Sequence, residues 1–578
     1  MSSRSRRHDC LAMLAVLILT AAVFAPAMRY GFLANWDDGI FIVENEHLGL
    51  TAENFRLYGL KHYRNLYTPL PMYSLMADHA LFGLDPAGYH IHNLLLHLGG
   101  AAFFFLVLRK LGVPTAAALL GTLLWALNPQ KNESVVWITE RKDVQMGLFA
   151  FAAFWCFLCA GESAATGKAA AWDTACALLT VAAIFAKPAA TPLCGVYPAW
   201  LLLHPDWRRR WRSSALNPVA AGLAATIWAG YMTAQDNPGS MESNPAIWLH
   251  NLLWYPATAF WPLHNPNPIY PAVGPLREHL ALLISVPLLV LALLWHARRR
   301  RHCHPAAILR AALILGGTLL PVLGLWHYTS FEYCDRYNYL VSAAAIAAVL
   351  PLFPQRPAAL AAGALLVAVM SLFTCRALPQ WQSDTTVWQA CLFRSGRLNP
   401  KAIEVAASDA FHRQDSAALA TIADRLSRDS SLLNQRHRRG ENTVLLLRSY
   451  AAFLQQRELD AAAFLAPLCT AEREKGGVRF LRGANYGIVY GYLKDELRFR
   501  TAPPLPEGMP PFRRKAQIIE NSPPGGKSYP SLSPGLLTVR APLQCGSKPQ
   551  FQYCHAGSCA FSAPIQNDHE HYQRSFLL

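Results

Sequence analysis

Long apolar runs alternate with short polar segments through the first two thirds of the chain. The earlier runs fall at residues 10–28, 92–108, 113–127, 144–160, 171–186 and 189–203. The later runs fall at 216–234, 281–296, 306–325, 339–353 and 358–374. Because about 20 apolar residues cross a bilayer as a helix, and tightly packed spans are often somewhat shorter, the pattern predicts an all-α polytopic membrane domain over residues 1–376 with about 11 spans.

The segment 247–264 is also apolar, but we expect it to lie at the membrane interface or to re-enter the membrane. It holds three tryptophans, two prolines and two histidines, and aromatic residues of this kind favour the interface. A span there would also place the basic cluster Arg298–Arg301 on the opposite side from the earlier basic clusters. Residues 247–264 are therefore not counted among the spans.

The last third of the chain lacks long apolar runs. Residues 380–498 predict a soluble region of short amphipathic helices, for example 443–455 and 459–468. Paired helices of this length fit a degenerate TPR-like helical hairpin, although no firm repeat period is present. Residues 500–578 are rich in proline, glycine and serine without a core-forming period, which predicts a disordered tail.

Composition and charge support this interpretation. Hydrophobic residues make up 53% of the 578 residues and charged residues only 15%, whereas a soluble domain has about 25% charged residues. The net charge of +16 comes largely from short basic clusters between the apolar runs. Since Lys and Arg accumulate in cytoplasmic loops, we predict a cytoplasmic amino terminus, a periplasmic carboxy-terminal region and no nucleic-acid partner.

Two adjacent carboxylates, Asp37 and Asp38, lie a few residues beyond the first apolar run. They belong to a predicted first external loop over residues 29–90, where its aromatic and proline residues indicate short interfacial helices. Acids at the polar face of a helical bundle are candidates for function because they are costly near hydrocarbon. Taken alone, Asp-Asp-Gly is more typical of a solvated turn.

Further motifs follow the acidic pair in a fixed order. They are Phe32–Asp38, Glu44-Asn45, Tyr67–Leu70, Leu81–Leu84, Gly88–His97, Asn128-Pro129, Glu133–Ile138, Glu140–Val144, Lys187-Pro188 and Asp335–Leu340. Together they resemble the membrane half of the bacterial TPR-containing membrane glycosyltransferases, which are similar to the transmembrane-and-TPR protein O-mannosyltransferases. The resemblance implies a GT-C fold, in which a multi-helix membrane enzyme moves a sugar from a polyprenyl-phosphate donor to an acceptor on the outer face. Asn128 stands where the resemblance leads us to expect a histidine.

The resemblance implies that Asp37 and Asp38 form the catalytic acidic motif. Glycosyl transfer needs a base for the acceptor hydroxyl and cations for the leaving phosphate. One aspartate would be the base and the other would orient it, and the sequence does not say which. The candidate donor-binding residues from the same motifs are Glu133, Arg141, Lys142, Lys187, Asp335, Arg336 and His90.

The basic candidates have an alternative interpretation as anchors or local ion pairs, Arg141 with Asp143 and Arg336 with Asp335. Lys187 is the most informative of them, because it lies between two predicted spans, where a charge is costly. Glu133 falls in a second polar external loop, predicted over 128–143. It could face the acidic pair or cap a short helix.

His90 is expected to make a structural or donor-binding polar contact, because the spacing of His90, His92 and His97 does not place them on one helical face. No metal site or other cofactor is predicted, and a requirement for a divalent metal stays open. The expected partners are the lipid bilayer, the polyprenyl-phosphate-linked sugar and a protein, glycan or lipid acceptor.

The predicted function is therefore that of a multi-pass inner-membrane hexosyltransferase, active on the periplasmic side. One alternative is a non-enzymatic membrane scaffold whose external helical repeats bind other proteins. Another is a lipid-linked saccharide transporter or polymerase, which needs polar residues at mid-bilayer depth, whereas the polar motifs here gather at one external face.

Overall fold

The computed structural model divides the chain into two compact units, residues 1–434 and 435–578, and each is described by itself. The structure describes residues 3–63, 67–163, 165–204, 213–234, 240–241, 244–261, 266–268, 270, 273, 283–288, 305–327, 332–394, 400–428, 439–475 and 493. The predicted disordered tail, 500–578, and most of the predicted span 281–296 lie outside these residues.

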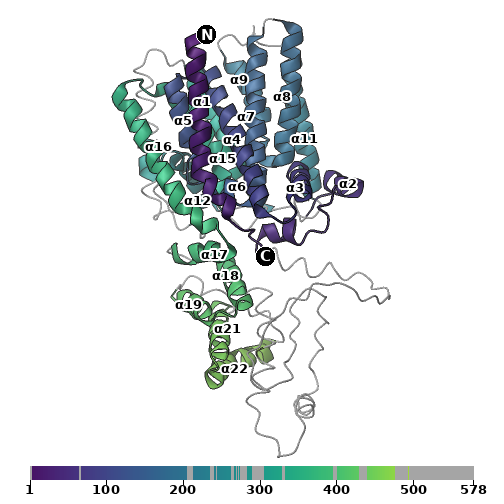
Figure 1. The fold of residues 1–578 in the computed structure, drawn as a ribbon, viewed down its shortest axis with the longest axis vertical. Coiled ribbons are helices and arrows are strands. Elements are labelled where there is room, and N and C mark those ends of the chain that lie inside the picture. Colours follow the sequence, from purple (N-terminus) through teal and green to yellow (C-terminus); the bar gives the residue numbers. More distant parts are fainter. Residues whose placement is uncertain are drawn as a thin grey trace, which may run out of the picture. The chain divides into compact units, whose positions relative to one another are not determined.

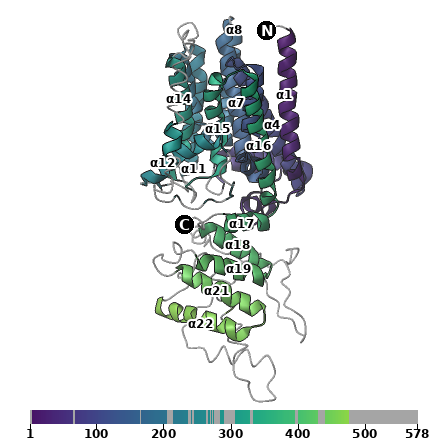
Figure 2. The ribbon, with the colours of Figure 1, turned by 90° about the vertical axis from the view of Figure 1, so that its left-hand side faces the viewer.

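The first unit is a bundle of long helices that run side by side (Figure 1). They are α1 (Ser3–Phe24), α4 (Pro86–Lys110), α5 (Thr115–Ala126), α7 (Arg141–Glu162), α8 (Thr166–Ala186), α9 (Leu193–Leu203), α11 (Asn217–Ala234), α14 (Pro305–Leu319), α15 (Asn338–Val349) and α16 (Pro357–Ala377). Figure 2 shows α14, α15 and α16 beside α7 in the same bundle.

Five helical segments among the described residues are long and apolar enough to cross a membrane. They are Arg6–Arg29, Pro86–Lys110, Ile138–Glu162, Gly167–Ala186 and Pro357–Trp381. Three shorter apolar helices accompany them, Thr115–Ala126, Pro188–Leu203 and Ile308–Val322. The chain is therefore a helical, multi-pass membrane protein, and the count of about 11 spans stays a prediction.

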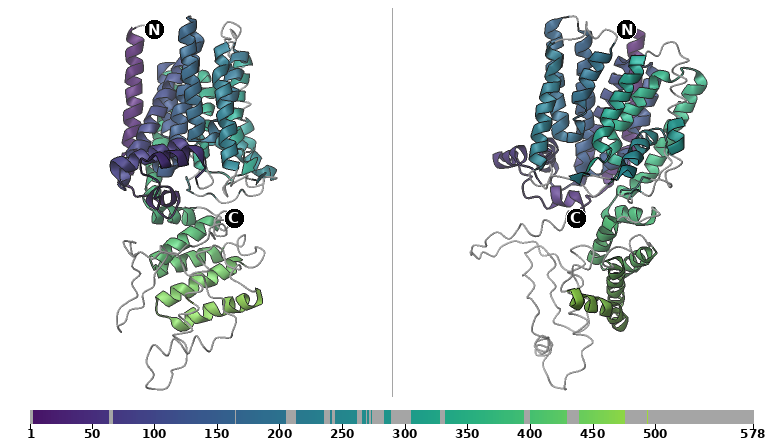
Figure 3. Two further views of the ribbon diagram at one scale, coloured as in Figure 1. Left: turned by 90° about the vertical axis from the view of Figure 1, so that its right-hand side faces the viewer. Right: turned by 180° about the vertical axis from the view of Figure 1, so that it is seen from behind.

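The two ends of the bundle differ in their residues. At the end that holds the start of α1, Arg109 Nε donates to Asp9 Oδ1 at 2.8 Å and Lys110 pairs with Glu162. The short helices α2 (Ala52–Leu60) and α3 (Pro69–Phe82) lie at the opposite end (Figure 3). Arg109 and Lys110, in the last turn of α4, thus lie at one end of the bundle. The helices α2 and α3, which follow the acidic pair in the chain, lie at the other end.

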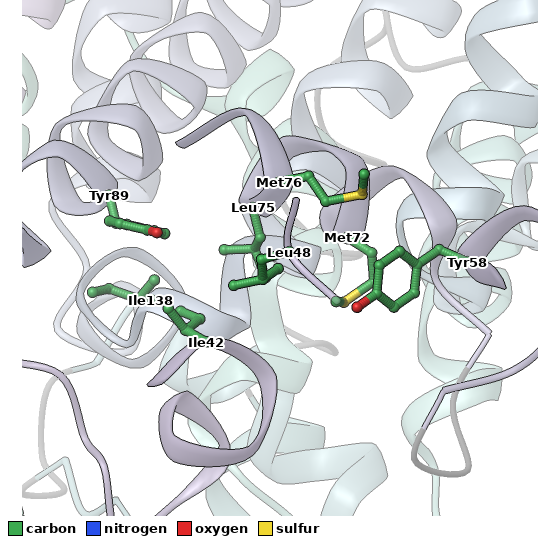
Figure 4. Packing of buried hydrophobic residues seen from close by; sticks show 8 residues of the cluster. All are labelled: Ile42, Leu48, Tyr58, Met72, Leu75, Met76, Tyr89 and Ile138. Carbon is green, nitrogen blue, oxygen red and sulfur yellow. The ribbon is translucent and has the colours of Figure 1, made fainter. Parts of the chain in front are cut away.

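The segment predicted as the first external loop, residues 29–90, contains short helices, as expected. After the 3₁₀ turn η1 (Ala25–Arg29) come the π-helical turn η2 (Gly39–Val43), α2 and α3. A buried apolar cluster, drawn in Figure 4, joins these segments to α4 and to the segment before α7; its members are Ile42, Leu48, Tyr58, Met72, Leu75, Met76, Tyr89 and Ile138. Burial of this cluster fixes the loop on the bundle because each large apolar side chain contributes about 1.5–3 kcal/mol.

The expectation that residues 128–143 form a polar loop is wrong, and the side of the membrane on which they lie stays a prediction. This segment forms α6 (Lys131–Val136) and η3 (Ile138–Glu140), and every residue from 121 to 147 is buried. The charged run resembles a loop in sequence because its ion-pair partners lie elsewhere in the chain. Buried charges are tolerated when they are paired in this way.

The segment expected at the interface contains α12 (Pro245–Thr258). It is not among the apolar helices long enough to cross a membrane in the described part of the chain. Asn251 on α12 donates to the carbonyl oxygens of Val322 and Glu332, which holds α12 against η7 (Leu320–Val322). The two-residue strands β1 (Ser240–Met241) and β2 (Trp326–His327) pair antiparallel.

Smaller turns connect the remaining helices. They are η4 (Pro188–Ala190), η5 (Ser213–Leu216), η8 (Asp335–Tyr337), η9 (Leu350–Leu352) and η10 (Leu378–Trp381). The first unit continues through α17 (Asp384–Arg394), α18 (Pro400–His412) and α19 (Ser416–Ser427), and the second unit holds α21 (Arg439–Leu454) and α22 (Glu458–Lys475). Helices are therefore present where the sequence predicts 443–455 and 459–468. Their TPR-like character stays a prediction.

Candidate active site

The acidic pair ends a tight turn, residues 33–38, which we call the acidic turn. The Trp36 N–H donates to the Leu33 carbonyl oxygen at 3.0 Å, and the Gly39 N–H donates to Trp36 at 3.1 Å. A Cβ atom at Gly39 would clash with the Ala34 carbonyl oxygen. Only glycine therefore allows this close approach, which brings Asp37 and Asp38 to the start of η2.

Asp38 anchors the acidic turn from within. Its Oδ2 accepts the Leu33 N–H at 2.9 Å and its Oδ1 accepts the Thr139 N–H at 3.0 Å. The side chain is only 1% exposed, so the solvated-turn alternative does not hold for this residue. Burial raises the pKa of Asp38 to about 7, although the two N–H donors favour its charged form.

Asp37 has a different environment, since it is half-buried where Asp38 is buried. The neighbouring Trp36 ring packs on Trp137, with ring centroids 4.0 Å apart. Together with the Asp38–Thr139 bond, this contact joins the acidic turn to the buried segment around η3. Of the two carboxylates, that of Asp37 is therefore the more exposed, and it lies beside a segment rich in charge.

That segment belongs to a network of ion pairs, which we call the charged network. Its three acids are Glu133, Glu140 and Asp143, and its three cations are Lys142, Lys187 and Arg336. Glu140 is central, because it contacts Lys142 at 3.2 Å, Lys187 at 3.3 Å and Arg336 at 3.6 Å. The three acids and three cations balance in formal charge.

Glu133 and Arg336 form a direct pair within the charged network. The Arg336 guanidinium donates to Glu133 Oε1, and the Arg336 backbone N–H donates to Oε2 at 2.8 Å. Both carboxylate oxygens of Glu133 accept from Arg336, and the Gln130 N–H at the start of α6 donates to Asn128 Oδ1 instead, so the helix-cap alternative is wrong. Burial raises the pKa of Glu133 to about 7, and Arg336 only partly offsets this effect.

Lys187 lies where α8 ends and η4 begins, between the two helices predicted on either side of it. Its Nζ donates to Asp143 Oδ1 at 2.7 Å, and Ser134 donates to the other oxygen of Asp143 at 3.2 Å. Burial alone would lower the pKa of Lys187, but the Asp143 and Glu140 carboxylates raise it above its usual range. Lys187 therefore stays a cation.

The cations of the charged network are more accessible than its acids. The side chains of Lys187 and Lys142 are 15% and 11% exposed, whereas that of Asp143 is 1% exposed and that of Glu140 4%. The cations thus present more surface than the acids. An anion that approached the network would meet ammonium groups first, in a partly desolvated setting where charge interactions are strong.

Arg141 is fully buried and lies in a separate cluster. Its guanidinium pairs with Asp78 at 2.5 Å, and its Nε donates to Asn93 Oδ1 at 2.7 Å. Asp78 also contacts His92 Nδ1 at 2.7 Å. Arg141 therefore pairs with Asp78, and not with Asp143 as one interpretation of the sequence had it. Arg336 contacts Glu133 and Glu140, which lie in a distant segment of the chain.

Asp335 accepts hydrogen bonds from two polar side chains, Gln130 and Tyr270, beside the charged network. Its carboxylate accepts from Gln130 Nε2 at 3.1 Å and from the Tyr270 hydroxyl at 3.0 Å. Nearby, Lys131 is fully buried and donates to Ser342 Oγ at 2.7 Å and to the Asn338 carbonyl oxygen at 3.2 Å. Burial lowers the pKa of Lys131 to about 7.

His90, His97 and Asn128 take part in none of the ion pairs described above. His97 Nδ1 lies 2.7 Å from the Tyr339 hydroxyl, while His90 is buried near the start of α4. Asn128 donates to the Thr258 carbonyl oxygen at 3.0 Å and accepts from the Gln130 N–H. Asn128 thus ties the segment before α6 to α12.

The described residues include no group of three or more His, Cys, Asp or Glu side chains that could hold a metal ion. The structure brings Glu133, Lys142, Lys187 and Arg336 together and places Arg141 and Asp335 in neighbouring clusters. Sequence reasoning missed Glu140 and Asp143 as members of the network. The alternation of acids and bases in Glu140-Arg141-Lys142-Asp143 was the available signal.

Comparison with known proteins connects part of the chain to one family, and no protein-family model matches it. A segment of 92 residues is 34% identical to protein O-mannosyl-transferase tmtc2 of Xenopus laevis, and 32% identical to TMTC2 of Mus musculus. A segment of 88 residues is 28% identical to human TMTC3. The first two matches cover 16% of this chain and 11% of the relatives' length.

Among solved structures, the chain is similar to ArnT from Cupriavidus metallidurans. The crystal structure bound to undecaprenyl phosphate gives a TM-score of 0.33 at 16% identity, over 87% of this chain and 81% of that one. The apo structure gives 0.35 at 14% identity, over 86% and 81%. It is the sequence match that confirms, over its 92 residues, the resemblance to the transmembrane-and-TPR protein O-mannosyltransferases.

Proposed function

We propose that this chain is a membrane glycosyltransferase that moves a hexose from a polyprenyl-phosphate donor to an acceptor hydroxyl. The sequence similarity to protein O-mannosyl-transferases supports the reaction class. The observation that supports the site is that the two aspartates of the acidic turn have different environments. Asp38 is buried and bound by the Leu33 and Thr139 N–H groups, whereas Asp37 is half-buried.

In the proposed reaction, Asp37 is the general base. It takes the proton of the acceptor hydroxyl while the acceptor oxygen forms a bond to the anomeric carbon of the sugar. The bond from that carbon to the phosphate oxygen breaks, and its electron pair leaves with the polyprenyl phosphate. Asp38 holds Asp37 in place by accepting the Leu33 N–H at the start of the turn and the Thr139 N–H of the neighbouring buried segment.

The charged network would stabilise the leaving phosphate. Lys142 and Lys187 are its most accessible cations, and cations that face developing negative charge are a major source of catalysis. Their acidic partners keep them charged and positioned without substrate. Burial raises the pKa of Glu133 to about 7, so part of the Glu133 population would be neutral. A neutral Glu133 compensates the positive charge of Arg336 less, and Arg336 would then attract a phosphate more strongly.

The end of the bundle that holds the acidic turn would face the periplasm. The opposite end holds Arg109 and Lys110, and basic residues of this kind accumulate on the cytoplasmic side. The amino terminus is then cytoplasmic, and the helices after α16 are periplasmic. In this arrangement the soluble helices bind or position the acceptor, which is a protein, a glycan or a lipid.

A reconstituted transfer assay tests this function. The purified chain in lipid vesicles would receive a polyprenyl-phosphate-linked hexose, and release of free polyprenyl phosphate would be followed after a hydroxyl acceptor is added. We expect release with the wild type and none with Asp37→Asn. The matched control is Asp85→Asn, because Asp85 caps α4 through the Ala87 N–H at 3.0 Å and asparagine caps equally well.

Equal release from the wild type and from Asp37→Asn would contradict the proposed role of Asp37. Loss of release from Asp85→Asn as well would show that any change at this end of the bundle disables the chain. No release from the wild type itself would instead make the membrane scaffold the better explanation, since it requires no catalytic carboxylate.

A further inference from the structure

The first helix after the last apolar segment, α17, contacts the acidic turn directly. The Asn35 N–H donates to both carboxylate oxygens of Asp384, at 3.2 Å each. The Gly31 N–H donates to the Gln382 carbonyl oxygen, also at 3.2 Å. These bonds join segments that are 349 residues apart in sequence. The start of α17 therefore binds the acidic turn at a second position, Asn35, in addition to the Leu33 N–H that Asp38 binds.

Asp384 is not required to cap its own helix. The Ser383 N–H donates to Thr386 Oγ1 at 3.0 Å, and the Thr386 N–H lies 3.4 Å from Ser383 Oγ. This reciprocal pair satisfies the helix start as a capping box does. The Asp384 carboxylate is therefore able to bind another segment, and it accepts the Asn35 N–H of the acidic turn.

Tryptophan packing reinforces the same junction. The Trp36 ring centroid lies 5.1 Å from that of Trp388 on α17 and 6.5 Å from that of Trp381 in η10. Trp36 also packs on Trp137. Because Trp36 directly precedes Asp37, its contacts with α17 and with the buried segment restrict where the Asp37 backbone can lie.

The acidic turn is thus held between two carboxylates. Asp38, which belongs to the turn, accepts the Leu33 N–H, and Asp384, which belongs to α17, accepts the Asn35 N–H. A hydrogen bond to a charged group contributes more than one between neutral groups. Loss of either carboxylate would free one side of the turn that carries Asp37.

We propose that Asp384 is a positioning residue for the acidic turn, through which the extramembrane helix α17 sets the orientation of Asp37. The proposal rests on the proposed function for its effect on catalysis, but its effect on the turn does not depend on it. Asp384 would touch neither sugar nor phosphate. Its removal should therefore lower kcat and leave the KM for the donor unchanged.

The test compares Asp384→Ala and Asp384→Asn in the full chain, by hydrogen exchange of the backbone amides of residues 31–39 and by transfer kinetics. We expect faster exchange in the acidic turn, and a kcat lower by about tenfold or more for Asp384→Ala. Asp384→Asn should fall between, because its amide oxygen still accepts one N–H. The matched control is Asp415→Asn, since Asp415 accepts the Ala418 N–H at 2.9 Å at the start of α19.

Unchanged exchange of the acidic turn in Asp384→Ala would overturn the proposal. Faster exchange spread equally over α17, α18 and α19, or the same effect from Asp415→Asn, would also overturn it, because either result indicates a general loss of helix stability. If the wild type transfers no sugar while Asp384→Ala still loosens the turn selectively, the positioning role stands and the proposed function fails.

Discussion

Replacing Asp38 by alanine probes how strongly this carboxylate anchors the acidic turn. The substitution leaves the N–H groups of Leu33 and Thr139 buried without their acceptors. Each buried, unsatisfied N–H costs about 1–3 kcal/mol. We therefore expect Asp38→Ala to lower the free energy of unfolding by about 2–6 kcal/mol.

Asp37→Asn should behave differently, because it keeps the size of a half-buried side chain that lies outside these two bonds. We expect it to change the free energy of unfolding by less than about 1 kcal/mol and to abolish sugar transfer. Thermal unfolding of both variants in lipid nanodiscs, followed by tryptophan fluorescence, measures the difference. The Trp36–Trp137 contact makes this signal sensitive to the turn itself.

Two results would refute this reasoning. An Asp38→Ala variant with the Tm of the wild type would show that the two buried N–H groups find other partners and that Asp38 is no anchor. An Asp37→Asn variant that loses as much stability as Asp38→Ala would show that both acids are structural. In either case the assignment of the base to Asp37 loses its structural support.

Three further predictions concern the clusters around the turn. Asp78→Asn breaks the buried pair with Arg141, which costs about 3–5 kcal/mol; the amount of folded protein in membranes should fall, and a normal amount would contradict this. Lys187→Gln should raise the KM for the donor about tenfold or more, and unchanged kinetics would remove Lys187 from the phosphate site. Because burial raises the pKa of Glu133 from 4.5 to about 7, this group favours the folded state at acid pH, and that contribution is lost as the pH rises from about 4.5 to 7. Glu133→Gln should flatten the dependence of Tm on pH in that window, whereas a profile like that of the wild type would contradict the shift.

The sequence predicts the helices well where apolar runs are long. It also predicts the break at Lys187 and the short helices of the first loop, because proline and charge mark these positions. These features depend on neighbouring residues, so local patterns of hydrophobicity are sufficient to find them. The acidic pair is found in the same way, as two charges directly after an apolar run.

The sequence does not predict which charges meet. Arg336 pairs with Glu133 at a separation of 203 residues, and Lys187 pairs with Asp143 at a separation of 44. Ion pairing is not directional along the chain, so a run of alternating charges gives equal support to a solvated loop and to a buried network. The burial of residues 121–147 decides between them, and it is a property of the assembled helices.

The most direct test of the proposed function is a comparison of glycans by mass spectrometry. Periplasmic proteins and lipids would be analysed from deletion cells complemented with the wild type or with Asp37→Asn, with both proteins present at equal amounts in the membrane. The account predicts a hexose-modified protein, glycan or lipid with the wild type alone. Identical glycan profiles from the two strains would contradict it.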